Sequence, residues 1–199
     1  MRYDKRKVKK MLSQFQSVGQ TLFTQGLVSS QGGNLSVKLG EHLVITHRGS
    51  PLGSIQEGDL VETGINKNNR ATPLASIELE VHRCIYRHTS ALAVVHAHPP
   101  YAVALSYTER DIIPCDVEGR ALLSRVPILG TEAEAKTEEL AGEIAKMLNK
   151  YKVVLVRGHG SFAISQLLEE ACCFTVTLEH SCRLLYLLRI LGVEPGGNP

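Results

Sequence analysis

The chain has 199 residues, of which 43% are hydrophobic and 21% charged, and its formal net charge at pH 7 is +2. These values are typical of a folded globular protein and argue against a disordered or fibrous chain. A chain of this length can bury a sizeable core, and we expect residues 1–199 to form a single domain.

Charge, cysteine and hydropathy patterns give no sign of a nucleic-acid, extracellular or membrane protein. Lysine and arginine are dense only in the first ten residues, which we interpret as the solvated face of a helix. The five cysteines form no Cys-x-x-Cys pair and no signal-peptide pattern opens the chain, which favours a cytoplasmic protein. The longest apolar stretch, near residues 184–191, is too short to span a bilayer.

The N-terminal part of the sequence predicts a helix, a hairpin and a second helix. Apolar residues recur every three or four positions between residues 7 and 24, which is the period of one helix face. A glycine-rich turn then precedes two short strands, 35–38 and 42–46, joined as a hairpin. The polar segment 54–69 should form a connection with one short strand at 60–63, and a helix should begin near residue 75.

The C-terminal part alternates strands and helices. Residues 91–98 and 152–157 are apolar runs that we interpret as buried strands. Helices should begin near Pro99-Pro100 and span about 133–149 and 167–191, with strands and turns between 112 and 130. This mixture predicts an α/β protein with a layered sheet flanked by helices.

The ends of the two buried strands carry the residues best suited to metal chemistry. Residues two apart in a strand point to one face, so His96 and His98 lie about 7 Å apart at the backbone and can converge on one cation. Glycine on both sides of His159 lets the backbone turn sharply and present a third imidazole. Three histidines with an open fourth position are typical of a catalytic zinc, which acts as a Lewis acid. A hydrogen-bonded histidine pair and an incidental turn histidine are the alternatives.

Glu78 lies in the first turn expected of the helix upstream of the histidine strand. A carboxylate there is favoured by the helix dipole. Spacing alone leaves open whether the side chain faces solvent or the metal.

The order of the motifs resembles the class II aldolase and adducin family, in particular fuculose-phosphate aldolase and its archaeal and bacterial relatives, over nearly the whole chain. The matching segments are Gly33-Asn34-Leu35-Ser36, Thr46 to Gly49, Ser76 to His82, the His96-Ala97-His98 pair and the late His159-Gly160. The resemblance implies a three-layer α/β/α sandwich with a largely antiparallel or mixed sheet. It also implies a fourfold-symmetric homotetramer with active sites at subunit interfaces.

The same resemblance implies a zinc-dependent aldolase. His96, His98 and His159 would bind Zn²⁺ or another divalent transition metal, and Glu78 would exchange protons with the substrate. The implied reaction breaks or forms a carbon–carbon bond in a ketose phosphate such as fuculose 1-phosphate, through an enediolate that the metal stabilises. The alternatives are a sugar-phosphate 4-epimerase or dehydratase on the same fold, and a non-catalytic interaction domain like the head of adducin.

The anion site is where this sequence departs from the family pattern. The candidate substrate- or phosphate-binding residues are Gln31, Gly33, Asn34, Thr46, Arg48, Gly49 and Ser76. Relatives usually carry small hydroxyl residues at the positions of Gln31, Arg48 and Ile77. Arg48 adds a cation that can grip a phosphate or a carboxylate, so the sequence leaves the nature of the anion open.

The residue for the second proton transfer is also open. Fuculose-phosphate aldolase uses a tyrosine from the neighbouring subunit, in the segment after the histidine strand, and no tyrosine lies between Asp111 and Gly130 here. Asp116 or Glu118 could replace it, or both could be ordinary turn acids.

Overall fold

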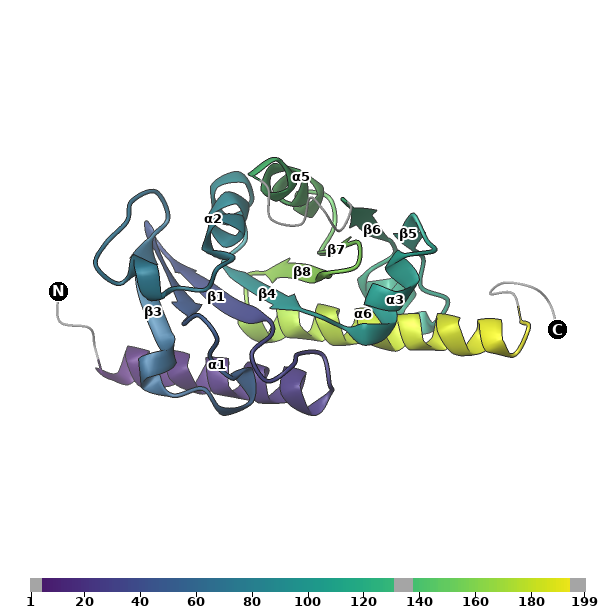
Figure 1. Cartoon of the computed structure of the whole chain (residues 1–199), viewed down its shortest axis with the longest axis horizontal. Coiled ribbons are helices and arrows are strands. Elements are labelled where there is room, and N and C mark those ends of the chain that lie inside the picture. Colours follow the sequence, from purple (N-terminus) through teal and green to yellow (C-terminus); the bar gives the residue numbers. More distant parts are fainter. Residues whose placement is uncertain (1–4, 131–137, 194–199) are drawn as a thin grey trace.

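The computed structural model describes residues 5–130 and 138–193, in which a mixed eight-stranded sheet lies between two layers of helices (Figure 1). The strands are β1 (Asn34–Leu39), β2 (His42–Thr46), β3 (Leu60–Gly64), β4 (Ala93–Ala97), β5 (Asp111–Ile112), β6 (Val126–Leu129), β7 (Val153–Val156) and β8 (Gly160–Ser165). Their order across the sheet is β3-β2-β1-β4-β8-β7-β6-β5. Neighbouring strands are antiparallel except β6 and β7, which are parallel.

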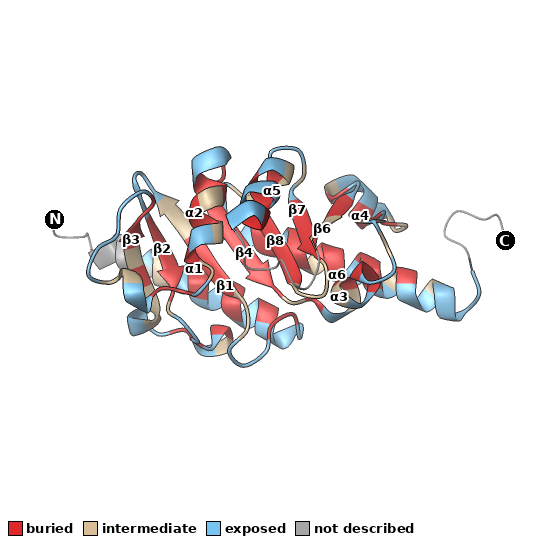
Figure 2. Cartoon of the chain, turned by 45° about the horizontal axis from the view of Figure 1, so that its top comes forward, coloured by how far each residue is buried: buried red, intermediate tan, exposed pale blue. Residues whose placement is uncertain are grey.

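Helices cover both faces of the sheet. They are α1 (Lys5–Thr24), α2 (Leu79–His88), α3 (Pro100–Ser106), α4 (Val117–Leu122), α5 (Glu138–Leu148) and α6 (Leu168–Ile190). One core lies between the sheet and α2 and α5, and the other lies between the sheet and α1, α3 and α6 (Figures 1 and 2). This arrangement confirms the predicted three-layer α/β/α fold with a mixed sheet.

The central strand β4 is buried along its whole length, as expected of a strand covered on both faces. Ala93, Val95 and Ala97 face the core under α6, and Val94 faces the core under α2. Because side chains alternate along a strand, His96 lies on the same face as Val94. β4 therefore directs a fully buried imidazole toward the α2 side of the sheet.

Most predicted elements are present, and the differences lie at their boundaries and in short elements. The hairpin, the two buried strands and the long C-terminal helix are confirmed. The helix expected near residue 75 begins at Leu79, after a 3₁₀ turn at Thr72–Leu74, and Glu78 is its N-cap residue. The helix expected over about 133–149 is observed from Glu138, and its predicted start lies outside the described residues.

Two elements were missed. β8 follows His159 directly, in a segment between the predicted turn and the last helix to which no strand was assigned. α4 interrupts the segment 112–130, which was predicted to contain only strands and turns. Within the described ranges, every helix is too short or too polar to cross a lipid bilayer.

Candidate metal centre

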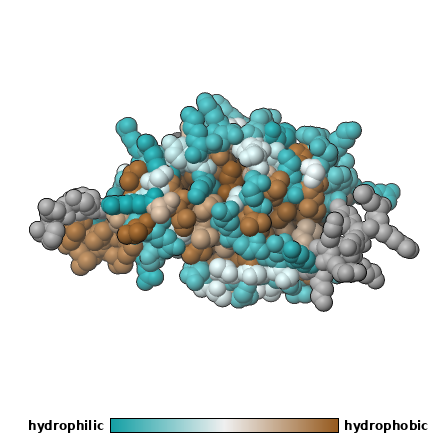
Figure 3. Space-filling model, turned by 180° about the vertical axis from the view of Figure 1, so that it is seen from behind, coloured by the Kyte–Doolittle hydropathy of each residue, from teal (hydrophilic) through white to brown (hydrophobic). Residues whose placement is uncertain are grey.

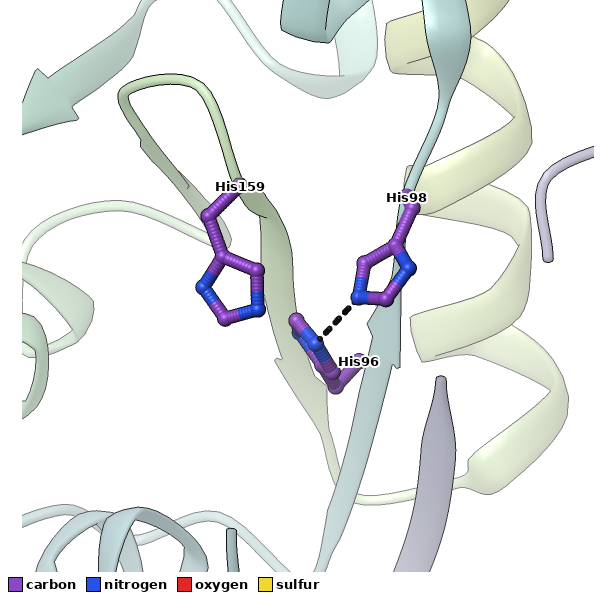
Figure 4. Close-up of side chains that lie close together, drawn as sticks. All are labelled: His96, His98 and His159. Carbon is purple, nitrogen blue, oxygen red and sulfur yellow. Dashed lines mark hydrogen bonds between the residues drawn. The ribbon is translucent and has the colours of Figure 1, made fainter. Parts of the chain in front are cut away.

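Three histidines converge at one end of the two central strands. His96 is in β4, His98 lies just beyond the end of β4, and His159 is in the turn between β7 and β8. One ring nitrogen from each lies within 4.8 Å of the others, and the Nε2 atoms of His96 and His98 are 2.9 Å apart (Figure 4). The structure therefore brings together the three residues that were predicted as metal ligands.

Strand pairing explains how His159 reaches the other two histidines. β4 and β8 are antiparallel, with Ala97 opposite Ser161, so the first residue of β8 lies beside the end of β4. A Cβ atom added to Gly160 would lie 2.4 Å from the carbonyl oxygen of Ala97 and 2.6 Å from Cδ2 of His98. Only glycine allows the turn to approach the histidine pair this closely.

The protonation of His96 suits a metal ligand. Its Nδ1 lies 3.0 Å from the carbonyl oxygen of Ser161, which can only accept, so Nδ1 carries the proton. In the neutral ring Nε2 then carries a lone pair, and it lies 3.0 Å from Glu78 Oε2. Two electron-rich atoms at this distance need a cation between them or a second proton on the ring. Neutral imidazoles held by a backbone carbonyl are the usual ligands of zinc and related metals, so the residues fit a divalent transition metal.

Glu78 completes the cluster. As the N-cap of α2 its side chain makes no capping hydrogen bond, which leaves both carboxylate oxygens available to the site. Oε2 accepts a hydrogen bond of 2.6 Å from Asn34 Nδ2, and Oε1 lies 3.4 Å from His159 Nε2. The Glu78 side chain is only 12% exposed. Of the two orientations that the sequence left open, the structure has the one facing the histidines.

The surroundings of Glu78 and His98 favour the forms that bind a cation. Burial alone would raise the pKa of Glu78, but the charge and hydrogen bond of His96, the hydrogen bond of Asn34 and the charge of His159 hold it well below its usual range. Burial, with repulsion from His96 and His159, lowers the pKa of His98 to about 4. The ionised Glu78 carboxylate and the neutral His98 imidazole are thus the favoured forms near pH 7.

A buried polar network beside the cluster was not singled out from the sequence. Ser36 Oγ lies 2.6 Å from His82 Nδ1 and 2.7 Å from the Tyr86 hydroxyl, and all three side chains are buried. Burial lowers the pKa of His82 to about 3 and raises that of Tyr86. The network links α2 to β1. Its sequence signal was the spacing of His82 and Tyr86, four and eight residues after Glu78 on one helix face.

The candidate anion-binding segments also meet next to the cluster. The backbone amide of Ser76 donates to the Thr46 carbonyl at 3.1 Å, and the amide of Leu35 donates to Thr46 Oγ1 at 3.3 Å. With the bond between Asn34 and Glu78, these contacts bring the start of β1, the end of β2 and the segment before α2 together.

Several of the predicted anion-binding side chains have other positions or roles. Gln31 and Arg48 are exposed, and Arg48 Nη2 lies 3.5 Å from the Pro73 carbonyl. Gly49 has a φ of 73°, and a Cβ atom there would meet nothing within 4 Å. Gly33 has a φ of 77° and lies against the backbone of His96, which gives it a structural reason to be glycine. Ile77 is 65% exposed beside Glu78.

The acids considered for the second proton transfer lie elsewhere. Asp116 caps α4, accepting hydrogen bonds from the Gly119 amide at 2.8 Å and from Ser181 Oγ at 2.6 Å. Glu118 lines a groove between α1 and α6. Both oxygens of Asp116 are therefore engaged within the protomer, one in capping α4 and the other in a hydrogen bond to α6.

Comparisons with known proteins agree with the fold. A family model described as Class II Aldolase and Adducin N-terminal domain matches residues 13–186. An L-fuculose phosphate aldolase of Methanocaldococcus jannaschii is 29% identical over 176 residues, which cover 87% of this chain and 94% of that protein. The crystal structure of l-fuculose-1-phosphate aldolase from Thermus thermophilus has a TM-score of 0.87 at 36% identity and covers 96% of this chain and 98% of that one.

A relative named for another activity matches to a similar extent. A 3-oxo-tetronate 4-phosphate decarboxylase of Pectobacterium atrosepticum is 27% identical over 178 residues, which cover 86% of this chain and 81% of that protein. A decarboxylase was not among the reactions expected from the sequence. The resemblance predicted from the order of the motifs is nevertheless confirmed, because the family model spans most of the sequence. The chain belongs to the class II aldolase and adducin family.

Proposed function

We propose that this protein is a metal-dependent lyase that breaks or forms a carbon–carbon bond in a ketose phosphate. His96, His98 and His159 hold a divalent ion, with Zn²⁺ as the first candidate, and Glu78 carries the proton. The observation that supports this most is the convergence of three imidazoles, with nitrogens within 4.8 Å of one another, and of the Glu78 carboxylate, 3.0 Å from His96 and 3.4 Å from His159. Relatives named as L-fuculose phosphate aldolases make a ketose 1-phosphate the substrate class to test first.

The chemistry divides between the ion and Glu78. When bound, a divalent ion supplies a Lewis acid for the oxygens of a hydroxy-carbonyl substrate. In the direction of bond formation, Glu78 as a carboxylate removes a proton from the carbon beside the carbonyl. In cleavage, which proceeds from the protonated form of Glu78, it returns that proton to the carbon that loses its bond. The hydrogen bond from Asn34 orients Glu78 Oε2, which leaves Oε1 for proton transfer.

Other reactions on the same site remain candidates of second rank. Epimerisation, dehydration and decarboxylation of a sugar phosphate can all begin with a polarised carbonyl, and the decarboxylase of Pectobacterium atrosepticum favours testing the last of these. The non-catalytic, adducin-like alternative is disfavoured because the histidines and Glu78 are all retained and face one another. Product assays with ketose phosphates and with a 3-oxo acid phosphate distinguish these reactions.

We further propose a homotetramer of single-domain chains, with the sites at subunit interfaces and the substrate the only small-molecule partner. Support comes from exposed large side chains at the projecting end of α6 and near α4. They are Ile113, Val117, Tyr186, Leu187, Ile190 and Leu191. Figure 3 shows a hydrophobic surface at the end of the molecule where α6 projects. Light scattering during gel filtration measures the mass; a monomer at micromolar concentration would contradict the proposal.

The decisive experiment compares Glu78→Gln with Glu143→Gln, an exposed control on α5. Metal content is measured by mass spectrometry, and hydrogen exchange at the carbon beside the carbonyl of dihydroxyacetone phosphate is followed by NMR in D₂O. Glu78→Gln should keep the metal and lose about 10²–10⁴-fold in exchange rate, the usual contribution of a general acid or base. Exchange at the wild-type rate in this variant would remove Glu78 from its role. Wild-type exchange in metal-free protein would end the proposal.

A further inference from the structure

The short helix α3 begins immediately after the histidine pair, and α6 holds its first turn. Glu179 of α6 is buried, and its two carboxylate oxygens accept hydrogen bonds from the backbone amides of Tyr101 and Ala102, each at 3.0 Å. These amides belong to the first turn of α3, where no intrahelical acceptor exists. Because Pro99 and Pro100 alone separate His98 from this turn, Glu179 fixes the direction in which the chain leaves β4.

The other end of α3 contacts the turn that carries the third histidine. Ser106, the last residue of α3, is fully buried, and its hydroxyl accepts a hydrogen bond of 2.9 Å from the amide of Gly158. The same hydroxyl donates to the Val103 carbonyl at 2.6 Å, so its free lone pair is aimed at Gly158. The Arg157 guanidinium donates to the Ser106 carbonyl as well. His159 is the next residue after these two contacts.

We propose that α3 is a strut that sets the distance between the histidine pair and His159, with Glu179 and Ser106 as positioning residues for the metal site. The proposal rests on the metal binding proposed above. The first turn of α3 is held to α6 by Glu179 and lies next to the histidine pair. The last residue of α3, Ser106, contacts the turn that carries His159. α3 packs against both α6 and β7, the elements that flank these contacts (Figure 1).

The turn at 157–159 needs such a support. Gly158 has a φ of 66°, in the region where glycine has the most conformational freedom, and His159 follows it. Without the Ser106 hydroxyl, the Gly158 amide would lose its partner and the turn could relax. Since metal–ligand distances tolerate shifts of only about 0.2 Å, a small rotation of this turn is enough to weaken binding.

The test uses the full-length protein, stripped of metal and titrated with Co²⁺, whose visible absorption reports ligand geometry. The variants are Ser106→Ala and Glu179→Gln, and the matched control is Ser181→Ala. Ser181 is also fully buried and lies two residues from Glu179, and its hydroxyl donates to Asp116 rather than contacting α3. Thermal unfolding of the metal-free proteins measures the loss of stability separately.

We expect Ser106→Ala and Glu179→Gln to weaken Co²⁺ binding by about 10–100-fold, the usual effect of losing an outer partner of a metal site, and to shift the absorption bands. Ser181→Ala should bind Co²⁺ like the wild type with unshifted bands. Wild-type affinity and spectrum in Ser106→Ala would overturn the strut and leave the metal site intact. Equal weakening in all three variants, in step with their melting temperatures, would also overturn it. A wild-type protein that binds neither Co²⁺ nor Zn²⁺ would overturn the metal site and the strut together.

Discussion

Replacing Gly160 by alanine should disrupt the histidine cluster through a steric conflict. The added Cβ would lie 2.4 Å from the Ala97 carbonyl oxygen, whereas ordinary contact begins at 3.4 Å, so the two strands must separate by about 1 Å. The same atom would lie 2.6 Å from Cδ2 of His98 and 3.2 Å from Cε1 of His96. Overpacking of this kind costs about 1–3 kcal/mol, and a shift of about 1 Å is several times the tolerance of a metal–ligand distance.

We therefore expect Gly160→Ala to lower the melting temperature by several degrees and to weaken Zn²⁺ binding at least about tenfold. Isothermal titration calorimetry measures the affinity, and circular dichroism follows the unfolding. The matched control is Gly142→Ala in α5, where the added Cβ meets nothing within 4 Å and should leave stability unchanged or raise it by up to about 1 kcal/mol. If Gly160→Ala binds zinc and melts like the wild type, the close approach of β4 and β8 described here is wrong.

Three further predictions concern metal removal, acid stability and a buried arginine. A chelator should lower the melting temperature of the zinc-loaded wild type. The corresponding loss of stability is about 3 kcal/mol if free zinc was about 100-fold above Kd. The chelator should leave the melting temperature of His98→Ala unchanged, and equal responses of the two proteins would contradict the metal site. Burial lowers the pKa of His82 to about 3, so between pH 6.5 and 3 the unfolded chain binds a proton that the native state does not bind. As the pH is lowered through this range, His82 therefore reduces the free energy of unfolding by up to about 1.4 kcal/mol per pH unit. Urea unfolding should show a shallower fall in His82→Gln, and identical slopes would count against this. Buried Arg83 donates hydrogen bonds to the Gly64 carbonyl and to two further acceptors in the loop 64–68. In urea unfolding, Arg83→Lys should therefore lower the free energy of unfolding by about 2–4 kcal/mol, and Arg87→Lys by less than about 0.5 kcal/mol. Similar losses in the two variants would refute the special role of Arg83.

The sequence predicted the parts of the fold that follow from periodicity. The short apolar runs that form β4 and β7 are typical of buried strands. The apolar stripe that forms α1 recurs with the period of a helix, so the pattern indicates one type of element in each case. β8 was missed because its residues, Gly160 to Ser165, are small and polar at both ends, and only the pairing with β4 on one side and β7 on the other makes them a strand. Tertiary pairing of this kind leaves no local signal.

The candidate site was predictable to the same degree. The spacing of His96 and His98 on one strand face follows from the pleat, but spacing could not decide the orientation of Glu78. That orientation depends on Asn34, which donates to its carboxylate from a segment 44 residues away. The contribution of Glu179 was equally hidden, since a glutamate in the middle of a helix is ordinarily exposed and here it is buried against the start of α3.

The direct pairing of β4 with β8 also has a consequence for how the protein folds. About sixty residues separate His98 from His159, so an ion bound by both closes a long loop that contains α3, β5, α4, β6, α5 and β7. The entropy of closing such a loop must be lost before the ligands meet, which delays their convergence until the strands on either side have formed. Capture of the ion therefore belongs to a late stage of refolding, after helix formation, and its release would free the contact between His98 and His159 to open first.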